Sequence, residues 1–200
     1  MQACMVTSTL SNTSFEDIAA VSCGEKWFQL YFQPNRTATL DLLSRAQTAG
    51  YTSIVVTVDT SIRTPSLSAV RAHFHMPDDC VAVNVNDYEA PSTHVITAGQ
   101  SRVFNGAMRE APTWADLEWL LNQTSLPVIV KGVLHSQDAQ KIKALGCAGI
   151  IVSNHGGRSL DGAPASIDCL AKIRAAVGDD YPGLFDGGIR SGLDIFKAIA

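Results

Sequence analysis

The chain has 200 residues, of which 46% are hydrophobic and 17% charged, and its formal net charge is -4. This size and composition fit one folded domain and exclude a disordered or coiled-coil chain. The acidic balance leaves no basic stripe that would attract a nucleic-acid backbone, so no nucleic acid is expected as a partner.

Strand-like and helix-like patterns alternate along the first part of the chain. Residues 5–8 and the apolar run over 27–32 predict two strands. Residues 39–49 follow with helical spacing, and Gly50 provides a stop. The β-branched run over 53–59 predicts a third strand.

The same alternation returns in the second part of the chain. It predicts strands over residues 127–132, 148–153 and 183–186. Each strand is followed by a predicted helix, over residues 136–145, over 166–177 and from Ser191 onward. Near-continuous apolar strands that alternate with helices predict a parallel sheet covered by helices, as in a barrel or a doubly wound fold.

A long connection over residues 61–112 separates the two parts. It has no sustained apolar period, and such long loops usually form lids or disordered segments, so we expect a lid-like loop within one domain of residues 1–200. His73 and His75 lie in this connection without a nearby carboxylate, which favours two loop histidines over a metal site.

The cysteines bear on the redox environment. The five cysteines are scattered and never spaced as C-x-x-C, which predicts reduced thiols and a cytoplasmic protein without a disulfide framework or zinc site. No apolar run is long enough to cross a bilayer, and the first residues lack the regions of a signal peptide. We therefore expect a soluble protein that is not exported.

Polar side chains follow nearly every predicted strand. Ligands of parallel α/β folds lie beyond the carboxyl ends of the strands. One polar residue there is usually only the start of a loop, whereas an acid, a base and several cations together point to a ligand site. The set comprises Ser8, Gln29, Tyr31, Thr57, Asp59, Lys131, Ser153, His155, Arg158, Asp186 and Arg190.

The sharpest motif is Ser-Asn-His-Gly-Gly-Arg at residues 153–158. It places the imidazole of His155 three residues from the guanidinium of Arg158, and the glycines between them allow close backbone approach to a ligand. A base beside an arginine that can bind a carboxylate suits catalysis on an anionic substrate. Taken alone, the motif also fits a glycine turn with a satisfied histidine and a surface arginine.

A second motif, Asp-Gly-Gly-Ile-Arg-Ser-Gly at residues 186–192, leads into a predicted helix. Free backbone N–H groups of this loop and the side chain of Arg190 could cradle a phosphate. Barrels commonly bind phosphate after a strand late in the sequence, which favours this interpretation.

Together with Phe-Gln-Leu-Tyr at residues 28–31, Thr-Val-Asp-Thr at 57–60 and Val-Lys-Gly-Val at 130–133, these motifs closely resemble the FMN-dependent α-hydroxy acid oxidases and dehydrogenases. That family includes glycolate oxidase, lactate oxidase and mandelate dehydrogenase. The resemblance covers essentially the whole chain. It implies an α/β fold of the (β/α)8 TIM barrel type, with about six of the eight strands present here, and FMN as cofactor.

The resemblance also implies roles for the residues at the strand ends. His155 would be the active-site base, and Asp59 would stabilise its imidazolium. Arg158 would hold the substrate carboxylate, and Tyr31 would hydrogen-bond the substrate. Lys131 would stabilise negative charge on the reduced flavin. Further flavin contacts would come from Ser8, Gln29, Thr57 and Ser153 and from the loop of Asp186, Gly187, Gly188 and Arg190.

Three departures from the family pattern bear on this interpretation. The chain begins where the family's second strand would be, and it stops inside the helix after the seventh strand. Flavin and substrate contacts from outside these strands would then be absent. Finally, the family usually has an arginine that helps to bind the substrate carboxylate where Ser66 stands here, three residues after Arg63.

The sequence thus predicts FMN-dependent oxidation of a small L-2-hydroxy acid to a 2-oxo acid. It leaves open the substrate side chain, the electron acceptor (oxygen, quinone or cytochrome) and the form in which the α-hydrogen leaves. A catalytically inactive fragment and another FMN-binding barrel are the alternatives, and the His155–Arg158 pair argues against the second. Unpaired strand edges favour self-association, so a homo-oligomer is also compatible with the sequence.

Overall fold

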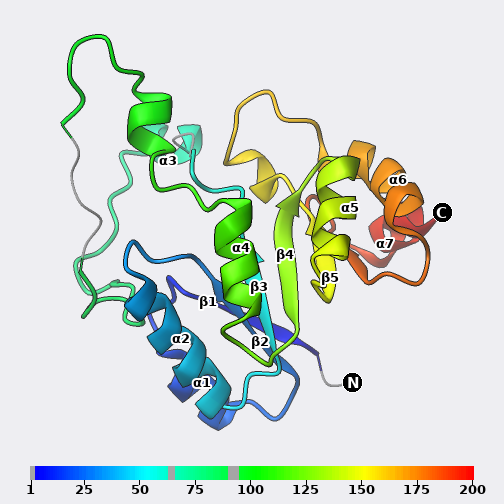
Figure 1. The fold of residues 1–200 in the computed structure, drawn as a ribbon, viewed down its shortest axis with the longest axis horizontal. Helices are drawn as coiled ribbons and strands as arrows, with labels where there is room; N and C mark the ends of the chain where they lie inside the picture. Colours follow the sequence, from blue (N-terminus) through cyan, green and yellow to red (C-terminus); the bar gives the residue numbers. More distant parts are fainter. Residues whose placement is uncertain (1–2, 63–65, 90–94) are drawn as a thin grey trace. The chain divides into compact units, whose positions relative to one another are not determined.

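The computed structural model describes residues 3–62, 66–89 and 95–200. The chain divides into two compact units. The first comprises Met1–Thr57 and Leu67–Val128, and the second comprises Val58–Ser66 and Ile129–Ala200. Strands alternate with helices along the chain in both units (Figure 1).

The strands of the first unit are β1 (Met5–Ser8), β2 (Lys26–Leu30) and β3 (Ser53–Thr57). They pair in parallel, with β2 between β1 and β3, and the register places Ser8 beside Gln29. Every residue of β3 is buried, as expected for a β-branched strand covered on both faces. The register therefore brings the polar residues at two strand ends together.

Each longer helix of the first unit begins at a capping side chain. A side-chain oxygen at this position accepts a backbone N–H that the first turn would otherwise leave without a partner. The caps are Ser14 for α1 (Phe15–Val21), Asn35 for α2 (Arg36–Thr48) and Thr113 for α4 (Trp114–Leu121), and Thr113 forms a capping box with Asp116.

An aromatic cluster forms the core of the first unit beneath β1 and β2. The ring centroids of Phe15 and Phe28 are 4.7 Å apart, and Tyr51 lies 5.8 and 6.0 Å from them. The Tyr51 hydroxyl donates to the Phe15 carbonyl at 2.9 Å, so its polar end is satisfied inside the core. Burial raises the pKa of Tyr51. The cluster fixes α1 against β1 and β2.

The long connection contains two short helical turns, α3 (Leu67–Arg71) and the π-helical η1 (Val103–Ala107). Part of it packs into the first unit through Asn84, which is buried. The Asn84 amide accepts from the Phe15 N–H at 3.0 Å and donates to the Thr9 carbonyl at 3.3 Å. A lid role for this connection stays a prediction, and residues 63–65 and 90–94 lie outside the described residues.

The strands of the second unit are β4 (Val128–Val133), β5 (Gly149–Val152) and β6 (Gly183–Phe185). Only the first residue of β4, Val128, belongs to the first unit. They pair in parallel with β5 in the middle. Lys131 pairs with Ile151 and Val133 with Val152, so the register shifts at the intervening Gly132. This β-bulge lies at the end of β4 where the site residues gather.

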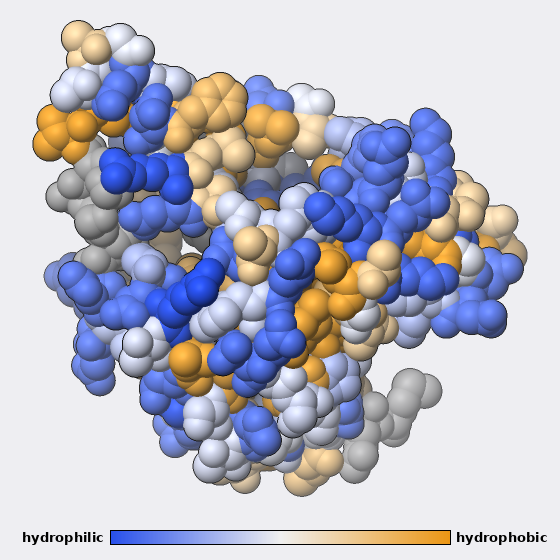
Figure 2. Space-filling view, in the orientation of Figure 1, coloured by the Kyte–Doolittle hydropathy of each residue, from blue (hydrophilic) through white to orange (hydrophobic). Residues whose placement is uncertain are grey.

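The helices of the second unit are α5 (Ser136–Ala144), α6 (Ser166–Val177) and α7 (Gly192–Ile199). In Figure 1, α5 and α6 run side by side. Ala139 and Ile142 form the buried side of α5, whereas its outward side is largely hydrophilic in Figure 2. Such a one-sided helix covers a sheet and faces water with the rest of its surface.

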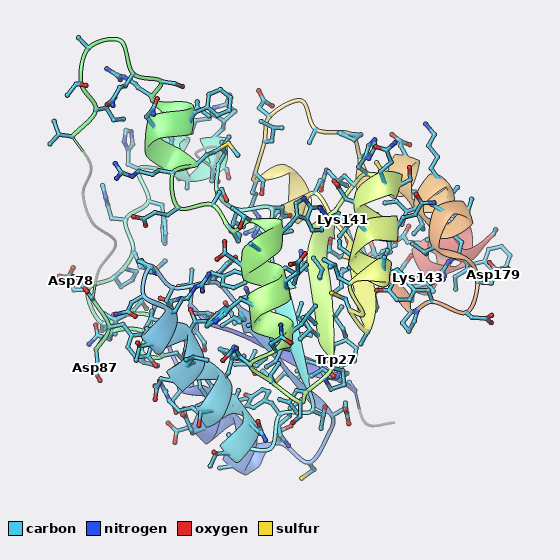
Figure 3. The ribbon with its side chains drawn as sticks, in the orientation of Figure 1. Trp27, Asp78, Asp87, Lys141, Lys143 and Asp179 are labelled. Carbon is cyan, nitrogen blue, oxygen red and sulfur yellow. The ribbon has the colours of Figure 1, made fainter. Side chains whose placement is uncertain are left out.

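A second buried tyrosine fixes the region where α5, α6 and β5 meet. The Tyr181 hydroxyl donates to the Cys147 carbonyl at 2.8 Å. Lys143, labelled in Figure 3, donates to the Val177 carbonyl at 2.6 Å and lies over the Tyr181 ring. Burial raises the pKa of Cys147 to about 11 and is the main cause that raises the pKa of Tyr181 to about 12.

The six predicted strands are confirmed, with ends that differ from the expected ones by at most two residues. The four predicted helices correspond to α2, α5, α6 and α7. The sequence patterns did not indicate α1, α3, α4 or η1. Among the described residues, no helix combines the length and the apolar character needed to cross a membrane.

Candidate active site

The second unit places His155 and Asp59 in direct contact. The distance between His155 Nδ1 and Asp59 Oδ1 is 3.0 Å, and both side chains are largely buried. The backbone before Asp59 is fixed because the Val58 N–H donates to the Lys131 carbonyl at 3.0 Å. His155 follows β5 with a φ of 58°, and its N–H donates to Ser153 Oγ at 3.1 Å. We refer to these two side chains as the His–Asp pair.

The contact decides the chemistry of the imidazole. An ionised carboxylate can only accept a hydrogen bond, so His155 Nδ1 carries a hydrogen when it faces Asp59. The neutral ring then keeps its free electron pair on Nε2, the nitrogen directed away from Asp59. An imidazole in this form can take up a proton, and the neighbouring carboxylate stabilises the resulting charge.

Arg158 is joined to the turn that carries His155. Its Nε donates to the His155 carbonyl at 3.0 Å, while its side chain is exposed. Asn154 closes the same turn, because its Oδ1 accepts from the Gly157 N–H at 3.2 Å. The structure thus holds a base and a guanidinium on one short turn, an arrangement that suits an anionic substrate.

A charged cluster of Lys131, Ser153 and Asp186 lies at the ends of β4, β5 and β6. Lys131 Nζ donates to Ser153 Oγ at 2.7 Å and pairs with Asp186 Oδ2 at 2.9 Å. Ser153 is completely buried, whereas the Asp186 side chain is 43% exposed. The lysine is therefore held in place by its neighbours and cannot turn freely into solvent.

Two carboxylate oxygens of this unit have no hydrogen-bond partner in the described part of the chain. They are Asp59 Oδ2 and Asp186 Oδ1, and both atoms are buried. A buried oxygen without a hydrogen bond costs folding free energy, so such an atom in a native protein usually accepts from a water molecule or a ligand. The sequence predicted both side chains to belong to the ligand site, Asp186 as a flavin contact and Asp59 as the partner of His155.

The loop after β6 is the one that the sequence predicts to cradle a phosphate. Gly187 and Gly188 have φ values of 108° and 78°, a region that favours glycine, and the Asp186 carbonyl accepts from Ser166 Oγ at 2.7 Å. At the N-terminus of α7, Ser191 Oγ accepts from the Asp194 N–H. The Asp194 carboxylate accepts from the Ser191 hydroxyl and the Arg190 N–H, and these two hydrogen bonds lower the pKa of Asp194. A phosphate here would therefore bind to the loop rather than to the helix end.

The first unit contains an amide row, formed by Ser8, Gln29 and Thr57. Ser8 Oγ donates to Gln29 Oε1 at 3.2 Å, and Gln29 Nε2 donates to Thr57 Oγ1 at 3.0 Å. Gln29 and Thr57 are buried. The row is uncharged, and it keeps the second hydrogen of the Gln29 amide and the Thr57 hydroxyl hydrogen for other acceptors.

Thr9 connects the amide row to Tyr31. Thr9 Oγ1 donates to the Gln29 carbonyl at 2.6 Å and accepts from the Tyr31 N–H at 3.1 Å. Thr9 is completely buried. Sequence reasoning did not select it, since a threonine one residue after a strand end is an ordinary loop residue.

Known proteins are similar to this chain in sequence and in fold. The sequence profile of the FMN-dependent dehydrogenase family matches residues 1–200. The chain belongs to this family. It is 58% identical over 197 residues to an L-lactate oxidase of Alicycliphilus denitrificans and 44% identical over 194 residues to a 4-hydroxymandelate oxidase of Amycolatopsis orientalis. These alignments cover 98% and 96% of the chain and 54% of each relative.

Solved structures of the family agree with this membership. A mandelate oxidase bound to (S)-2-phenylpropionate matches with a TM-score of 0.81 and 40% identity, over 98% of this chain and 52% of that one. A mandelate oxidase mutant with a C4a-OH-FMN adduct matches with the same TM-score and 39% identity, over 98% and 53% of the two chains. The chain thus spans about half the length of the relatives it matches, and its fold class is an incomplete α/β barrel of this family.

The structure distributes the family's expected site residues over the two units. The second unit brings together the His–Asp pair and the charged cluster, with Arg158 on the turn of His155 and Arg190 exposed on the glycine loop. The first unit holds the amide row and Tyr31. Arg63, three residues before the position of the family's arginine, lies outside the described residues. Sequence reasoning missed Thr9, Ser166 and Gly132.

Proposed function

We propose that this chain carries the catalytic base and the flavin contacts of an FMN-dependent oxidase of small L-2-hydroxy acids. The observation that carries the proposal is the 3.0 Å contact between His155 Nδ1 and Asp59 Oδ1, in a chain of the FMN-dependent dehydrogenase family. The relatives at 58% and 44% identity are named for lactate and 4-hydroxymandelate, which are both 2-hydroxy acids.

The residues present fit an FMN molecule. Lys131 Nζ has three hydrogens, of which Ser153 and Asp186 take two, so one donor and the positive charge are left for an anionic ring. The buried Asp186 Oδ1 has no described partner and could accept from a ribityl hydroxyl. The glycine loop offers backbone N–H groups to a phosphate. The amide row offers neutral donors to the polar edge of a flavin.

The chemistry follows from which groups can hold a charge. When bound, FMN would supply the acceptor for the two electrons that leave the substrate. Arg158 would bind the substrate carboxylate and so orient the carbon that is oxidised. His155 Nε2 would take one proton, from the hydroxyl or from the α-carbon. Asp59 would stabilise the imidazolium, and Lys131 would hold a positive charge beside the electron acceptor.

The finer features of the reaction are part of the same proposal. Lactate is the first substrate to test, because the relative at 58% identity is named for it. Molecular oxygen is the first acceptor to test, because the relatives are named oxidases. A homo-oligomer and a cytoplasmic location stay predictions.

Two proteins test the proposal. The first is the 200-residue chain, titrated with FMN while flavin fluorescence is followed. The second is a chimaera that adds the segments of the Alicycliphilus relative lying outside the matched region. We expect the chimaera to bind FMN and its flavin to be bleached by L-lactate without oxygen.

The outcomes separate the alternatives. If the chain binds no FMN but the chimaera is active, residues 1–200 hold a working site that needs further segments. If the chimaera binds FMN but no 2-hydroxy acid of a panel reduces it, the catalytic proposal is wrong and an inactive scaffold is favoured. D-Lactate is the control for chirality.

A further inference from the structure

We propose that Gly132 is a positioning residue for the base: its bare Cα is the surface against which the Asp59 carboxylate is held, and Asp59 in turn orients His155. The inference rests on the proposed function, since it assumes that the His–Asp pair is the working base. It adds a residue that the sequence motifs did not single out for any role.

The approach of Asp59 to Gly132 leaves no room for a side chain. A Cβ atom at Gly132 would lie 2.5 Å from Asp59 Cβ, 2.6 Å from Asp59 Cγ and 3.0 Å from Asp59 Oδ1. Non-bonded carbon atoms are in optimal contact at about 3.5–4.0 Å. Because Asp59 Cβ is attached directly to the backbone, rotation of the side chain cannot relieve the overlap.

The backbone at Gly132 is arranged to make this approach. Its φ is 103°, and it is the extra residue of the bulge between Lys131 and Val133. Bulges re-aim side chains near active sites, and here the bulge turns the bare Cα of β4 toward Asp59. Glycine is the residue that satisfies both the backbone angle and the close contact.

Asp59 has few other restraints on its carboxylate. Oδ1 contacts His155, while Oδ2 is buried without a partner in the described part of the chain. No second hydrogen bond from the described residues therefore fixes the rotation of this group. The Val58 N–H is bonded to the Lys131 carbonyl, so the backbone of Asp59 cannot withdraw from β4. Among the described residues, packing against Gly132 is the other restraint on the carboxylate plane.

The chain offers a matched control for this contact. Gly146 lies in the same unit with a φ of 88°, and a Cβ atom there would meet nothing within 4 Å. Alanine at either glycine has the strain of a left-handed backbone. Only Gly132→Ala adds the overlap with Asp59, and the double variant described below separates this overlap from backbone strain.

The first experiment uses the 200-residue chain and needs neither flavin nor turnover. Thermal unfolding is measured for Gly132→Ala, Gly146→Ala, Asp59→Gly and the Gly132→Ala/Asp59→Gly double variant. Overpacking of this kind should lower the Tm of Gly132→Ala by roughly 2–12 °C more than that of Gly146→Ala. Asp59→Gly removes the atoms that overlap, so the excess should vanish in the double variant. Equal losses in both backgrounds would overturn the proposal.

Proton NMR of the same proteins reports the position of the base. The Nδ1–H of His155, identified by its absence in His155→Gln, should give a downfield signal in the unsubstituted chain and in Gly146→Ala. The signal should be lost or shifted in Gly132→Ala. If Gly132→Ala does not fold while the double variant does, the contact is again the cause. An unchanged signal in a folded Gly132→Ala chain counts against the proposal.

The catalytic arm uses the chimaera. A misplaced base should lower kcat by about 100-fold and leave KM for L-lactate within about twofold, since the carboxylate clamp is not touched. Gly146→Ala should have the kcat of the unsubstituted chimaera. If the unsubstituted chimaera reduces no flavin, the proposed function fails, whereas the Tm and NMR measurements still decide the role of Gly132.

Discussion

The two units hold polar groups of different kinds at their strand ends. The amide row of the first unit is neutral, and its members are bonded to one another. The charged cluster and the His–Asp pair of the second unit carry ionisable groups, and two of their buried oxygens have no described partner. Neutral donors can hold a ligand without responding to its charge, whereas ionisable groups respond when charge develops. In the proposed function, the first unit would therefore contribute flavin binding and the second unit the chemistry.

The largest effect should follow from removal of the base. His155→Gln in the chimaera should slow flavin reduction by L-lactate by roughly 10²–10⁴-fold, the usual loss when acid–base catalysis is removed. FMN should stay bound, because the proposed role of His155 is toward the substrate. Rapid mixing without oxygen measures the rate, and His75→Gln in the exposed connection is the control. A near-normal rate in His155→Gln would contradict the division between the units.

A smaller effect is expected from the substrate clamp. Arg158→Met removes hydrogen bonds from a charged group to the substrate carboxylate, which are worth about 1.5–3 kcal/mol or roughly 10–150-fold in KM. A modest loss of kcat should accompany it, because the bond from Nε to the His155 carbonyl is also lost. Steady-state kinetics with L-lactate measures both. Arg109→Met, on an exposed residue of the connection, should leave KM unchanged.

The first unit should respond in binding rather than in rate. Gln29→Leu breaks the amide row and should raise the Kd for FMN by roughly 2- to 13-fold, the worth of one neutral hydrogen bond. Once FMN is saturating, flavin reduction should proceed close to the original rate. Fluorescence titration gives the Kd, and the control is Gln140→Leu, at an exposed residue of α5. A loss of rate at saturating FMN would show that the row takes part in chemistry.

Alkaline pH should weaken both units, because burial also raises the pKa of Tyr51 and Tyr88 in the first unit, but the larger shifts lie in the second unit. The pKa values of Cys147 and Tyr181 are raised from 9.0 to about 11 and from 10.0 to about 12, mainly by burial. A raised folded pKa gives stability that is fully present below the unfolded value and lost as pH rises toward the folded value. The second unit should therefore weaken between pH 9 and pH 12.

The chain's own fluorophores make this measurable. All three tryptophans, Trp27, Trp114 and Trp119, lie in the first unit. As pH rises, far-UV circular dichroism should lose signal before tryptophan fluorescence changes. Tyr181→Phe removes one ionisation and should narrow the gap between the two transitions. Simultaneous transitions would mean that the units do not differ in this respect.

The strands were predictable because their residues carry the signal themselves. Ile54, Val55 and Val56 form a β-branched run, which is typical of strands, and this run is the centre of β3. The end of each apolar run also predicts where a strand ends, and this prediction identifies the polar residues that follow the strands. The contact between His155 and Asp59 could be anticipated only through the family resemblance, since the two residues are 96 positions apart.

The elements that were not predicted depend on short signals or on packing. Ser14 caps α1, and Thr113 and Asp116 form a capping box at α4, but each helix is too short to show a clear apolar period. These caps were the signals that could have revealed both helices. Asn84 gave no signal, because a single asparagine in a polar connection is ordinary. Gly132 belongs to the Val-Lys-Gly-Val motif, but that motif gives no sign of its contact with Asp59, which depends on how β4 packs beside that residue.

The hydrogen bonds around Ser153 have a consequence for the direction of a single proton. A hydroxyl has two acceptor positions and one hydrogen, and Ser153 Oγ accepts from both Lys131 Nζ and the His155 N–H. Both acceptor positions are thereby filled, so the hydroxyl hydrogen must point to a third group. The ammonium also polarises the O–H bond and strengthens it as a donor. The Ser153 hydroxyl is therefore fixed as a hydrogen-bond donor by Lys131 and the His155 backbone, and its direction does not depend on a ligand.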